Sequence, residues 1–190
     1  MRHLGTKTIE TKRLVLRRFT IDDAAAMYDN WARDPEVTKF LTWPPHSCPE
    51  ISQRVLQDWV DQYDLDDFYQ WAIVFKENDN APIGSISVVH KNDKTNTIEI
   101  GYCIGRQWWR RGITSEALSA LIKFFIEEVG VNRIEAHHDT RNPNSGKVMM
   151  KCGMKYEGTM RAADWNNLGI CDYCQYALLA CDHIKAVQST

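Results

Sequence analysis

Residues 99–116 of the chain read EIGYCIGRQWWRRGITSE. An alternating apolar segment leads into a short basic loop, and the loop leads into the start of an apolar pattern with helical spacing. A strand, a loop and a helix N-terminus in this order aim free backbone N–H groups and the positive end of the helix dipole at one point. Such a point binds anions, and Gly112 lets an anion approach the main chain closely. The stretch therefore predicts an anion site at residues 109–114.

The kind of anion is narrowed by what the loop lacks. It contains neither the G-x-x-x-x-G-K-[ST] motif nor a G-x-G-x-x-G motif after a strand, which disfavours a kinase, an ATPase and a dinucleotide dehydrogenase. The net charge of −2 over 190 residues gives no positive field for nucleic acid. Arg106, Arg110 and Arg111 nevertheless form a local basic cluster. We therefore expect a compact anionic ligand and no nucleic-acid partner.

Periodicity outward from this stretch predicts a mixed sheet covered by helices, because the strands at 97–104 and 133–139 flank a crossover helix. The length suits a single domain over residues 1–190. The predicted strands are 13–19, 69–76, 83–91, 97–104, 133–139, 156–162 and 172–180. The predicted helices are 24–32, 49–63, 115–129 and a short one from 143 that ends at Gly153.

The sequence also bears on compartment and metals. No apolar run approaches the roughly 18 residues of a membrane span, and residues 1–10 lack the apolar segment of a secretory signal. We therefore expect a cytoplasmic protein with no membrane partner, whose six cysteines are thiols. Cys171 and Cys174 form a C-x-x-C motif near His183, but strand residues three apart point to opposite faces. The adjacent His137 and His138 are separated in the same way, so we expect no metal site.

Several separated motifs together resemble one family. Residues 98–118 (IEIGYCIGRQWWRRGITSEAL) are similar to the acetyl-CoA loop of the GNAT superfamily of N-acetyltransferases, in its ribosomal-protein alanine N-acetyltransferase-like (RimJ/RimL-type) branch. The N-P-N-S at 142–145 followed by K-C-G-M at 151–154 resembles a second element of that branch. The segments 11–24 and 164–179 resemble its first and last strands, so the resemblance covers nearly the whole chain in order.

The resemblance implies a fold and a cosubstrate. The implied GNAT fold is α+β (mixed α/β), a mostly antiparallel sheet of about seven strands with a parallel splay, flanked by about four helices. Acetyl-CoA, without a metal, would place its pyrophosphate on the N–H groups of about 110–115 and its pantetheine arm in the splay. The implied acetyl-CoA-binding residues are Cys103, Ile104, Gly105, Trp109, Arg110, Arg111, Gly112, Ile113, Thr114, Ser115, Asn142 and Lys151. Two positions depart from the family pattern: Thr114 replaces a Gly or Ala, and Met154 replaces a Phe.

The family pattern also implies direct attack of an amine on the thioester, without a covalent enzyme intermediate. Glu99 is the candidate base, although it is also compatible with an ordinary surface-strand carboxylate; its neighbours Ile98 and Ile100 place it on the opposite face from theirs. Ser145 is the candidate donor to the leaving sulfur, although a serine at a helix N-terminus is also a routine structural residue. Many family members carry a Tyr where this chain has Met149, so that role does not carry over, and Tyr156 is a weaker substitute.

The acceptor is less legible from the sequence. Segments 40–46 and 164–170 occupy the places where the family builds its acceptor cleft, and Trp43 and Trp165 would line it, unless they only pack in the core or rim. The expected activity is acetyl transfer to a primary amine, either a protein N-terminus or a small molecule such as an amino sugar, a polyamine or an amino acid. A non-catalytic acyl-CoA sensor and a phosphate- or nucleotide-binding protein unrelated to CoA are the alternatives. The sequence leaves a homodimer open.

Overall fold

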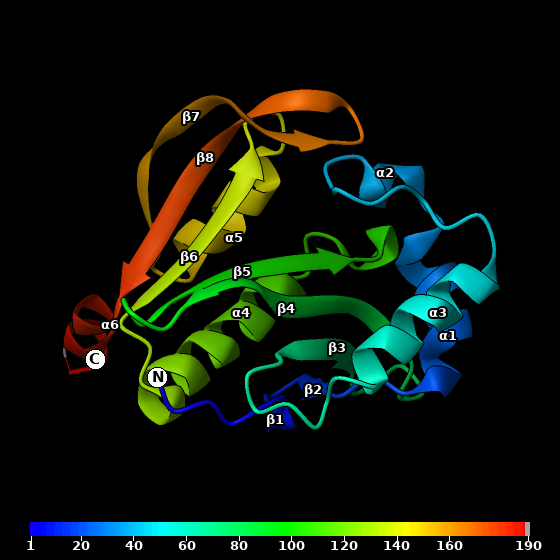
Figure 1. Cartoon of the computed structure of the whole chain (residues 1–190), viewed down its shortest axis with the longest axis horizontal. Helices are drawn as coiled ribbons and strands as arrows, with labels where there is room; N and C mark the ends of the chain where they lie inside the picture. The colour runs from blue at the N-terminus through cyan, green and yellow to red at the C-terminus, as the bar shows by residue number, and fades with distance from the viewer. Residues whose placement is uncertain (189–190) are drawn as a thin grey trace.

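The computed structural model describes the backbone of residues 1–188 and the side chains of residues 1–184. Its centre is one eight-stranded sheet in the order β1-β2-β3-β4-β5-β6-β8-β7 (Figure 1). The strands are β1 (Ile9–Glu10), β2 (Leu14–Arg17), β3 (Gln70–Phe75), β4 (Pro82–Asn92), β5 (Thr97–Ile104), β6 (Arg133–Asp139), β7 (Lys155–Asn166) and β8 (Gly169–Leu179). The helices are α1 (Ala24–Met27), α2 (Pro35–Thr38), α3 (Pro49–Val60), α4 (Ile113–Phe124), α5 (Pro143–Lys151) and α6 (Ala180–Gln188).

The predicted mixed, mostly antiparallel sheet is confirmed. Every pair of neighbouring strands is antiparallel except β5 and β6, which are parallel. The structure adds the short strand β1 and the helices α2 and α6 to the predicted elements. Within the described residues no helix is both long enough and apolar enough to cross a membrane.

The long central helix begins and ends where glycine allows it. Gly112 precedes α4 with φ of 71°, and the helix therefore starts at Ile113, two residues before the predicted start. A π-helical turn continues it to Val129, and Gly130, with φ of 82°, ends it as predicted.

The sheet separates two apolar layers, and β3 shows how. Its alternate residues Trp71 and Ile73 belong to the cluster that contains α4, whereas Ala72 and Val74 belong to the cluster of α1 and α3. A strand buried on both faces reads as a continuous apolar run, and five of the six residues of β3 are buried. Figure 1 shows α1 and α3 at one end of the molecule and α4 running beside β4 and β5.

The parallel pair separates soon after it forms. β5 and β6 pair at Thr97↔Arg133, Ile98↔Ile134 and Glu99↔Glu135, and the described residues show no pairing between them beyond that point. β6 keeps its pairing with β8 along its whole length. β5 follows β4, in which a bulge between Val88 and His90 bends the strand pair. The two strands therefore form a fork that opens at Glu99 (Figure 1).

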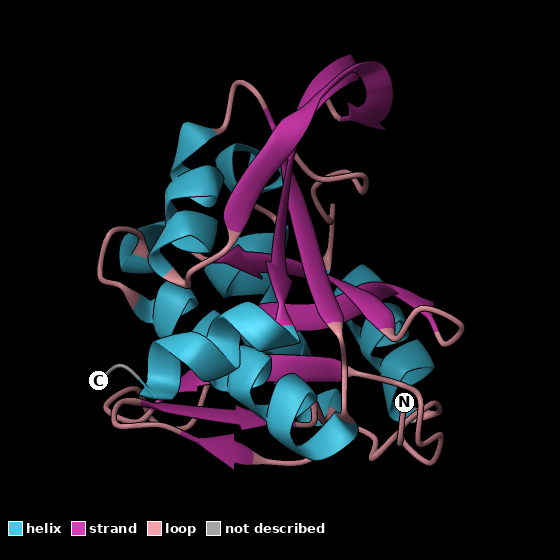
Figure 2. Cartoon of the chain, turned by 90° about the vertical axis from the view of Figure 1, so that its left-hand side faces the viewer, coloured by secondary structure: helices cyan, strands magenta, loops and turns pink. Residues whose placement is uncertain are grey.

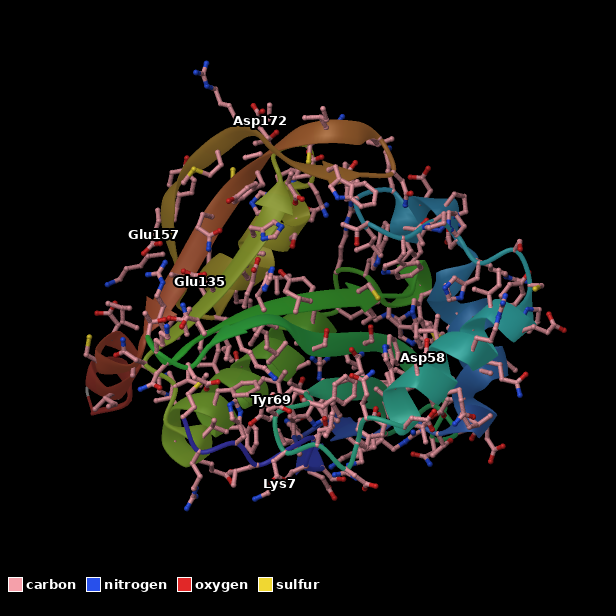
Figure 3. The ribbon with its side chains drawn as sticks, viewed as in Figure 1. Lys7, Asp58, Tyr69, Glu135, Glu157 and Asp172 are labelled. Carbon is pink, nitrogen blue, oxygen red and sulfur yellow. The ribbon has the colours of Figure 1, made fainter. Side chains whose placement is uncertain are left out.

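The predicted loop between the last two strands is wrong, because β7 and β8 form one long hairpin. Their pairing continues to Asn166↔Gly169, so only residues 167 and 168 form the turn. Gly169, the residue after the turn, takes φ of 95°, a left-handed conformation that glycine adopts freely and that often follows a hairpin turn. Further along the strands from the turn, the Asp172 carboxylate (labelled in Figure 3) accepts a hydrogen bond from the Ala162 N–H at 2.7 Å. The hairpin rises above the helices and curls over at its tip (Figure 2).

Candidate active site

The fork between β5 and β6 opens into a cavity of about 860 Å³. Its walls come from β5, β6, the loop before α4, the N-terminal half of α5, the hairpin and the segment after α2. The predicted site residues that line it are Glu99, Cys103, Ile104, Trp109, Arg110, Gly112, Ile113, Thr114, Ser115, Asn142, Ser145, Lys151 and Trp165. Trp43, Gly105 and Arg111 lie outside this lining.

The loop before α4 presents main-chain donors and cations to the cavity. Arg110 and Gly112 both adopt positive φ, 62° and 71°. No group in the described part of the chain accepts a hydrogen bond from the N–H of Arg110, Arg111 or Gly112. A Cβ on Gly112 would lie 3.6 Å from Lys151 Nζ and 3.7 Å from Arg13 Nη2. The loop therefore combines free N–H groups, a helix N-terminus and two nearby cations, which together bind anions.

Arg13, which the sequence analysis did not single out, contacts this loop from the residue just before β2. Its Nη1 donates to the Arg111 carbonyl at 3.0 Å, and its Nε donates to Glu116 Oε2 at 2.6 Å. Burial alone raises the pKa of Glu116, but hydrogen bonds from Thr11 and Arg13 outweigh it and hold that pKa below its ordinary value. Glu116 therefore stays ionised in the first turn of α4, where the helix dipole stabilises a negative charge.

Along the fork, β5 offers an unpaired strand edge. Beyond Glu99 the edge that faces β6 has no strand partner among the described residues, and the Ile104 carbonyl accepts from the Trp109 indole N–H at 2.8 Å. Burial raises the pKa of Cys103, whose sulfur lies 3.3 Å from Ser85 Oγ, so the side chain is a thiol. Asn142 is the N-cap of α5 on the opposite side. An extended ligand with amide groups fits between these edges.

Glu99 lies at the point where the fork opens. The predicted orientation is confirmed, since Ile98 and Ile100 are in the core while Glu99 lines the cavity. One carboxylate oxygen, Oε1, is hydrogen-bonded to His137 Nδ1. The other, Oε2, has no hydrogen-bond partner among the described residues. Glu99 therefore keeps one free acceptor oxygen in a largely buried carboxylate.

Ser145 faces a second hydroxyl that the sequence analysis missed. The Tyr102 hydroxyl donates to the Ser145 carbonyl at 3.0 Å and lies 2.9 Å from Ser145 Oγ. Burial raises the pKa of Tyr102, so both groups are neutral donors on the cavity wall. Tyr156 instead lies outside the lining, is exposed, and pairs with the Thr159 hydroxyl. Strand alternation puts Tyr102 on the same face of β5 as Ile98 and Ile100, so its position in the sequence predicts a core residue.

The two tryptophans proposed for the acceptor cleft differ in place. Trp165, on β7, lines the cavity and is 58% exposed. Trp43 packs against the cluster of α1 and α3, with its ring centroid 5.3 Å from that of His46. Trp43 therefore packs behind the cavity wall, whereas Trp165 lies at the rim of the cavity.

One residue ties the hairpin tip to the segment after α2. The Asn167 side-chain amide donates to the carbonyls of Thr38, at 2.9 Å, and Trp43, at 2.8 Å. The Asn167 backbone N–H donates to the Leu41 carbonyl at 3.2 Å. We call this set of contacts the Asn167 clasp. It closes the side of the cavity between β7 and α2.

Replacing Asn167 by Ala should loosen the clasp, because two of its three hydrogen bonds come from the side chain. We expect amide hydrogen exchange in residues 38–43 and 163–170 to speed up by about thirtyfold, since two bonds that each contribute on the order of 1 kcal/mol are lost. Exchange mass spectrometry measures it. Leu168→Ala, in the same turn, is the matched control and should leave the rates alone. Equal exchange in the Asn167 variant and the control would contradict the role of the clasp.

The cysteine and histidine pairs do not assemble into a site for a metal. Within the described residues no group of three His, Cys, Asp or Glu side chains is arranged to hold a metal ion. His137 contacts Glu99 and Asp164, whereas His138 packs toward Gly146 of α5, so the adjacent histidines face opposite sides of β6. The prediction that the two side chains point to opposite faces of the strand is confirmed.

One cavity therefore holds a carboxylate at the fork of two parallel strands and a loop suited to an anion, as the resemblance to amine acetyltransferases implies. The particular family follows from comparison with known proteins. A family model described as an acetyltransferase (GNAT) domain matches residues 13–155. The chain belongs to the GNAT acetyltransferase family.

Individual relatives agree with this assignment. The chain is 30% identical over 175 residues to the N-acetyltransferase p20 of Bacillus licheniformis, which covers 91% of this chain and 96% of that one. It is 34% identical over 156 residues to the ribosomal protein uS5-alanine N-acetyltransferase of Escherichia coli K12, with 79% of each chain covered. Among solved structures, RimL, a ribosomal L7/L12 α-N-protein acetyltransferase in complex with coenzyme A, superimposes with a TM-score of 0.81 at 20% identity, over 91% of this chain and 98% of that one. The last comparison shows the shared fold.

Proposed function

We propose that this enzyme transfers the acetyl group of acetyl-CoA to the α-amino group of a protein N-terminus. The observation that carries the proposal is the free Oε2 of Glu99 at the opening of the fork, in the same cavity as the anion-binding loop. An amine must lose a proton before it attacks a thioester, and a carboxylate with a free oxygen can take that proton.

The residues of the cavity fit acetyl-CoA. The N–H groups of residues 110–115, Lys151 and Arg13 suit its phosphates, and the unpaired edge of β5 suits its amide-bearing arm, with Asn142 on the other side. When bound, acetyl-CoA supplies the activated thioester. Thr114 is half-buried at the start of α4 and can contribute through its backbone N–H, so the missing glycine at that position is no obstacle.

The remaining roles go to Glu99, Ser145 and Tyr102. Glu99 Oε2 accepts a proton from the acceptor ammonium, directly or through water. The Tyr102 proton can turn from the Ser145 carbonyl to Ser145 Oγ, and the Ser145 hydroxyl then donates its own proton in a hydrogen bond to the sulfur as negative charge collects there. Because burial keeps the Tyr102 hydroxyl protonated, it holds the Ser145 hydroxyl in place rather than competing for a proton.

Support for a protein N-terminus as acceptor comes from relatives and from the rim. The relative of Escherichia coli named above acts on the alanine of a ribosomal protein. Trp165 and Ile170, cross-strand neighbours at the hairpin tip, are 58% and 76% exposed, which offers apolar surface to the first side chains of a peptide.

The test combines binding with an acceptor panel. Calorimetry should show acetyl-CoA binding at micromolar affinity or tighter. Peptides with different N-terminal residues are then compared with amino sugars, polyamines and amino acids, with free CoA release as the rate and mass spectrometry to locate the acetyl group. Faster turnover of peptides at the α-amine supports the proposal. Faster turnover of a small amine would show that the acceptor is that amine and not a protein N-terminus. Binding of acetyl-CoA without turnover of any amine would favour an acyl-CoA sensor.

The cation at the loop gives a separate prediction. Lys151→Ala should raise the dissociation constant for acetyl-CoA about tenfold, because a charge-assisted contact with phosphate is lost. The same variant should bind S-acetylpantetheine, which lacks the phosphates, as the unaltered enzyme does. Lys123→Ala on the exposed side of α4 is the control. If the Lys151 variant weakened the binding of acetyl-CoA and of S-acetylpantetheine equally, Lys151 would not act on phosphate.

A further inference from the structure

His137 bridges three strands inside the cavity. It lies on β6 two residues beyond Glu135, the last residue of that strand to pair with β5. Its Nδ1 is hydrogen-bonded to Glu99 Oε1 on β5, and its Nε2 lies 3.0 Å from Asp164 Oδ2 on β7. All three side chains line the cavity. The ring therefore links β5, β6 and β7 through side chains, just beyond the point where the main-chain pairing of β5 with β6 stops.

The two contacts fix the charge of the ring. An ionised carboxylate only accepts hydrogen bonds, so each ring nitrogen that faces one must carry a proton. If both carboxylates are ionised, both ring nitrogens donate and His137 is an imidazolium. The hydrogen bond to Glu99 raises the pKa of His137, burial opposes that rise, and the charges of Glu99 and Asp164 add to it, so the pKa lies above its ordinary value.

The other acidic groups around His137 are already paired with arginine side chains. On β6 the two neighbours on its face are Glu135 (Figure 3), bonded to Arg133, and Asp139, bonded to Arg141. From β8 the Tyr173 ring packs at 4.7 Å between centroids. Since these neighbours are neutralised or uncharged, Glu99 and Asp164 decide the charge state of His137. The three groups together carry one net negative charge.

We infer that His137, held as an imidazolium by Asp164, is a positioning residue for the base Glu99. It occupies Oε1 and so turns Oε2 toward the acceptor, and the net negative charge of the three groups attracts an ammonium ion. In the proton transfer, an N–H bond of the acceptor breaks and an O–H bond forms at Glu99 Oε2, while His137 keeps both of its protons. This inference rests on the proposed function, because it assigns a partner to the base of that reaction.

The charge state can be measured without any acceptor. A nuclear magnetic resonance titration of labelled histidine should show His137 with a pKa above 6.5. Asp164→Asn should lower that pKa by about half a unit or more, because one of the two stabilising charges is lost. His3→Asn is the matched control, since His3 also bonds a carboxylate, Asp93, but lies outside the cavity lining. A His137 that titrates at or below 6.5, or ignores Asp164→Asn, overturns the inference.

Kinetics test the positioning role. His137→Asn keeps an N–H donor near the place of Nδ1, whereas His137→Ala keeps none. We expect kcat to fall about tenfold in the Asn variant and about a hundredfold in the Ala variant, with KM for acetyl-CoA within about twofold. His3→Asn should match the unaltered enzyme. A residue that only supports the fold would instead alter thermal stability and KM together.

The possible failures are distinguishable. If the unaltered enzyme acetylates amines and both His137 variants turn over equally well, the inference fails and the proposed function stands. If the unaltered enzyme binds acetyl-CoA and acetylates no amine in the panel, the proposed function fails and the role of His137 fails with it. The titration still reports whether the ring is an imidazolium.

Discussion

Glu99→Gln should lower kcat by about 10²- to 10⁴-fold, the range that a positioned base contributes. Glutamine has nearly the same shape and can still accept a hydrogen bond from His137, but it cannot take a proton. Acetyl-CoA affinity should be unchanged, because Glu99 lies at the fork and away from the anion-binding loop. The residual rate should rise about tenfold per pH unit until the acceptor amine is deprotonated in solution, since the variant then depends on free amine alone.

The measurement is kcat at saturating acetyl-CoA over a pH series, with the best acceptor of the panel. Glu128→Gln, an exposed glutamate on the turn that follows α4, controls for the loss of a negative charge. If the Glu99 variant keeps kcat within about threefold, the amine is deprotonated elsewhere and Glu99 is a structural residue of the fork.

Gly105→Ala should destabilise the protein by about 3 kcal/mol or more, the upper range for overpacking a filled site. A Cβ there would lie 2.3 Å from the Asn30 carbonyl oxygen and within 2.9 Å of two carbons of the Trp108 ring. The backbone cannot yield easily, because Gly105 N–H donates to the Ile83 carbonyl and its own carbonyl accepts from Trp108 N–H. The φ of −57° is open to any residue, so the effect comes from space alone.

Urea unfolding measures this change as a shift of the midpoint at constant m-value. Gly158→Ala is the matched control: no atom lies within 4 Å of its added Cβ, and its φ is not in the left-handed region. A Gly105 variant as stable as the Gly158 variant would show that the start of the loop is loosely packed.

Much of the fold could be predicted because apolar periodicity records burial directly. The strand at 133–139 is confirmed to the residue, since its flanks carry clear turn signals. The helix at 115–129 was placed two residues late because Gly112 itself forms the cap. The tip of the β7–β8 hairpin differs from the prediction, because residues 164–166 pair across the strands while being mostly polar or exposed, which hides the alternation that burial would impose.

The site divides in the same way. The anion-binding loop is contiguous in sequence, so its residues could be named together, and the structure gathers nearly all of them in one cavity. Strand register and the twist of the sheet bring other residues to their separate partners, namely His137 to Asp164, Tyr102 to Ser145 and Arg13 to Glu116. Sequence distance conceals such contacts: Arg13 reaches Glu116 across 103 positions and His137 reaches Asp164 across 27. Pairing across a fork has no local signature.

The Asn167 clasp has a consequence for how this enzyme can change over evolutionary time. The groups assigned to proton transfer and to phosphate lie on β5, β6, α5 and the loop before α4, with Asp164 supporting them from β7, whereas the clasp joins the segments 38–43 and 165–170 at the rim of the cavity. Selection can therefore reshape the entrance through those two segments while the groups that handle protons and phosphate stay fixed. A single side chain holds the border, so one substitution opens it. New acceptors are accessible to this lineage in small steps.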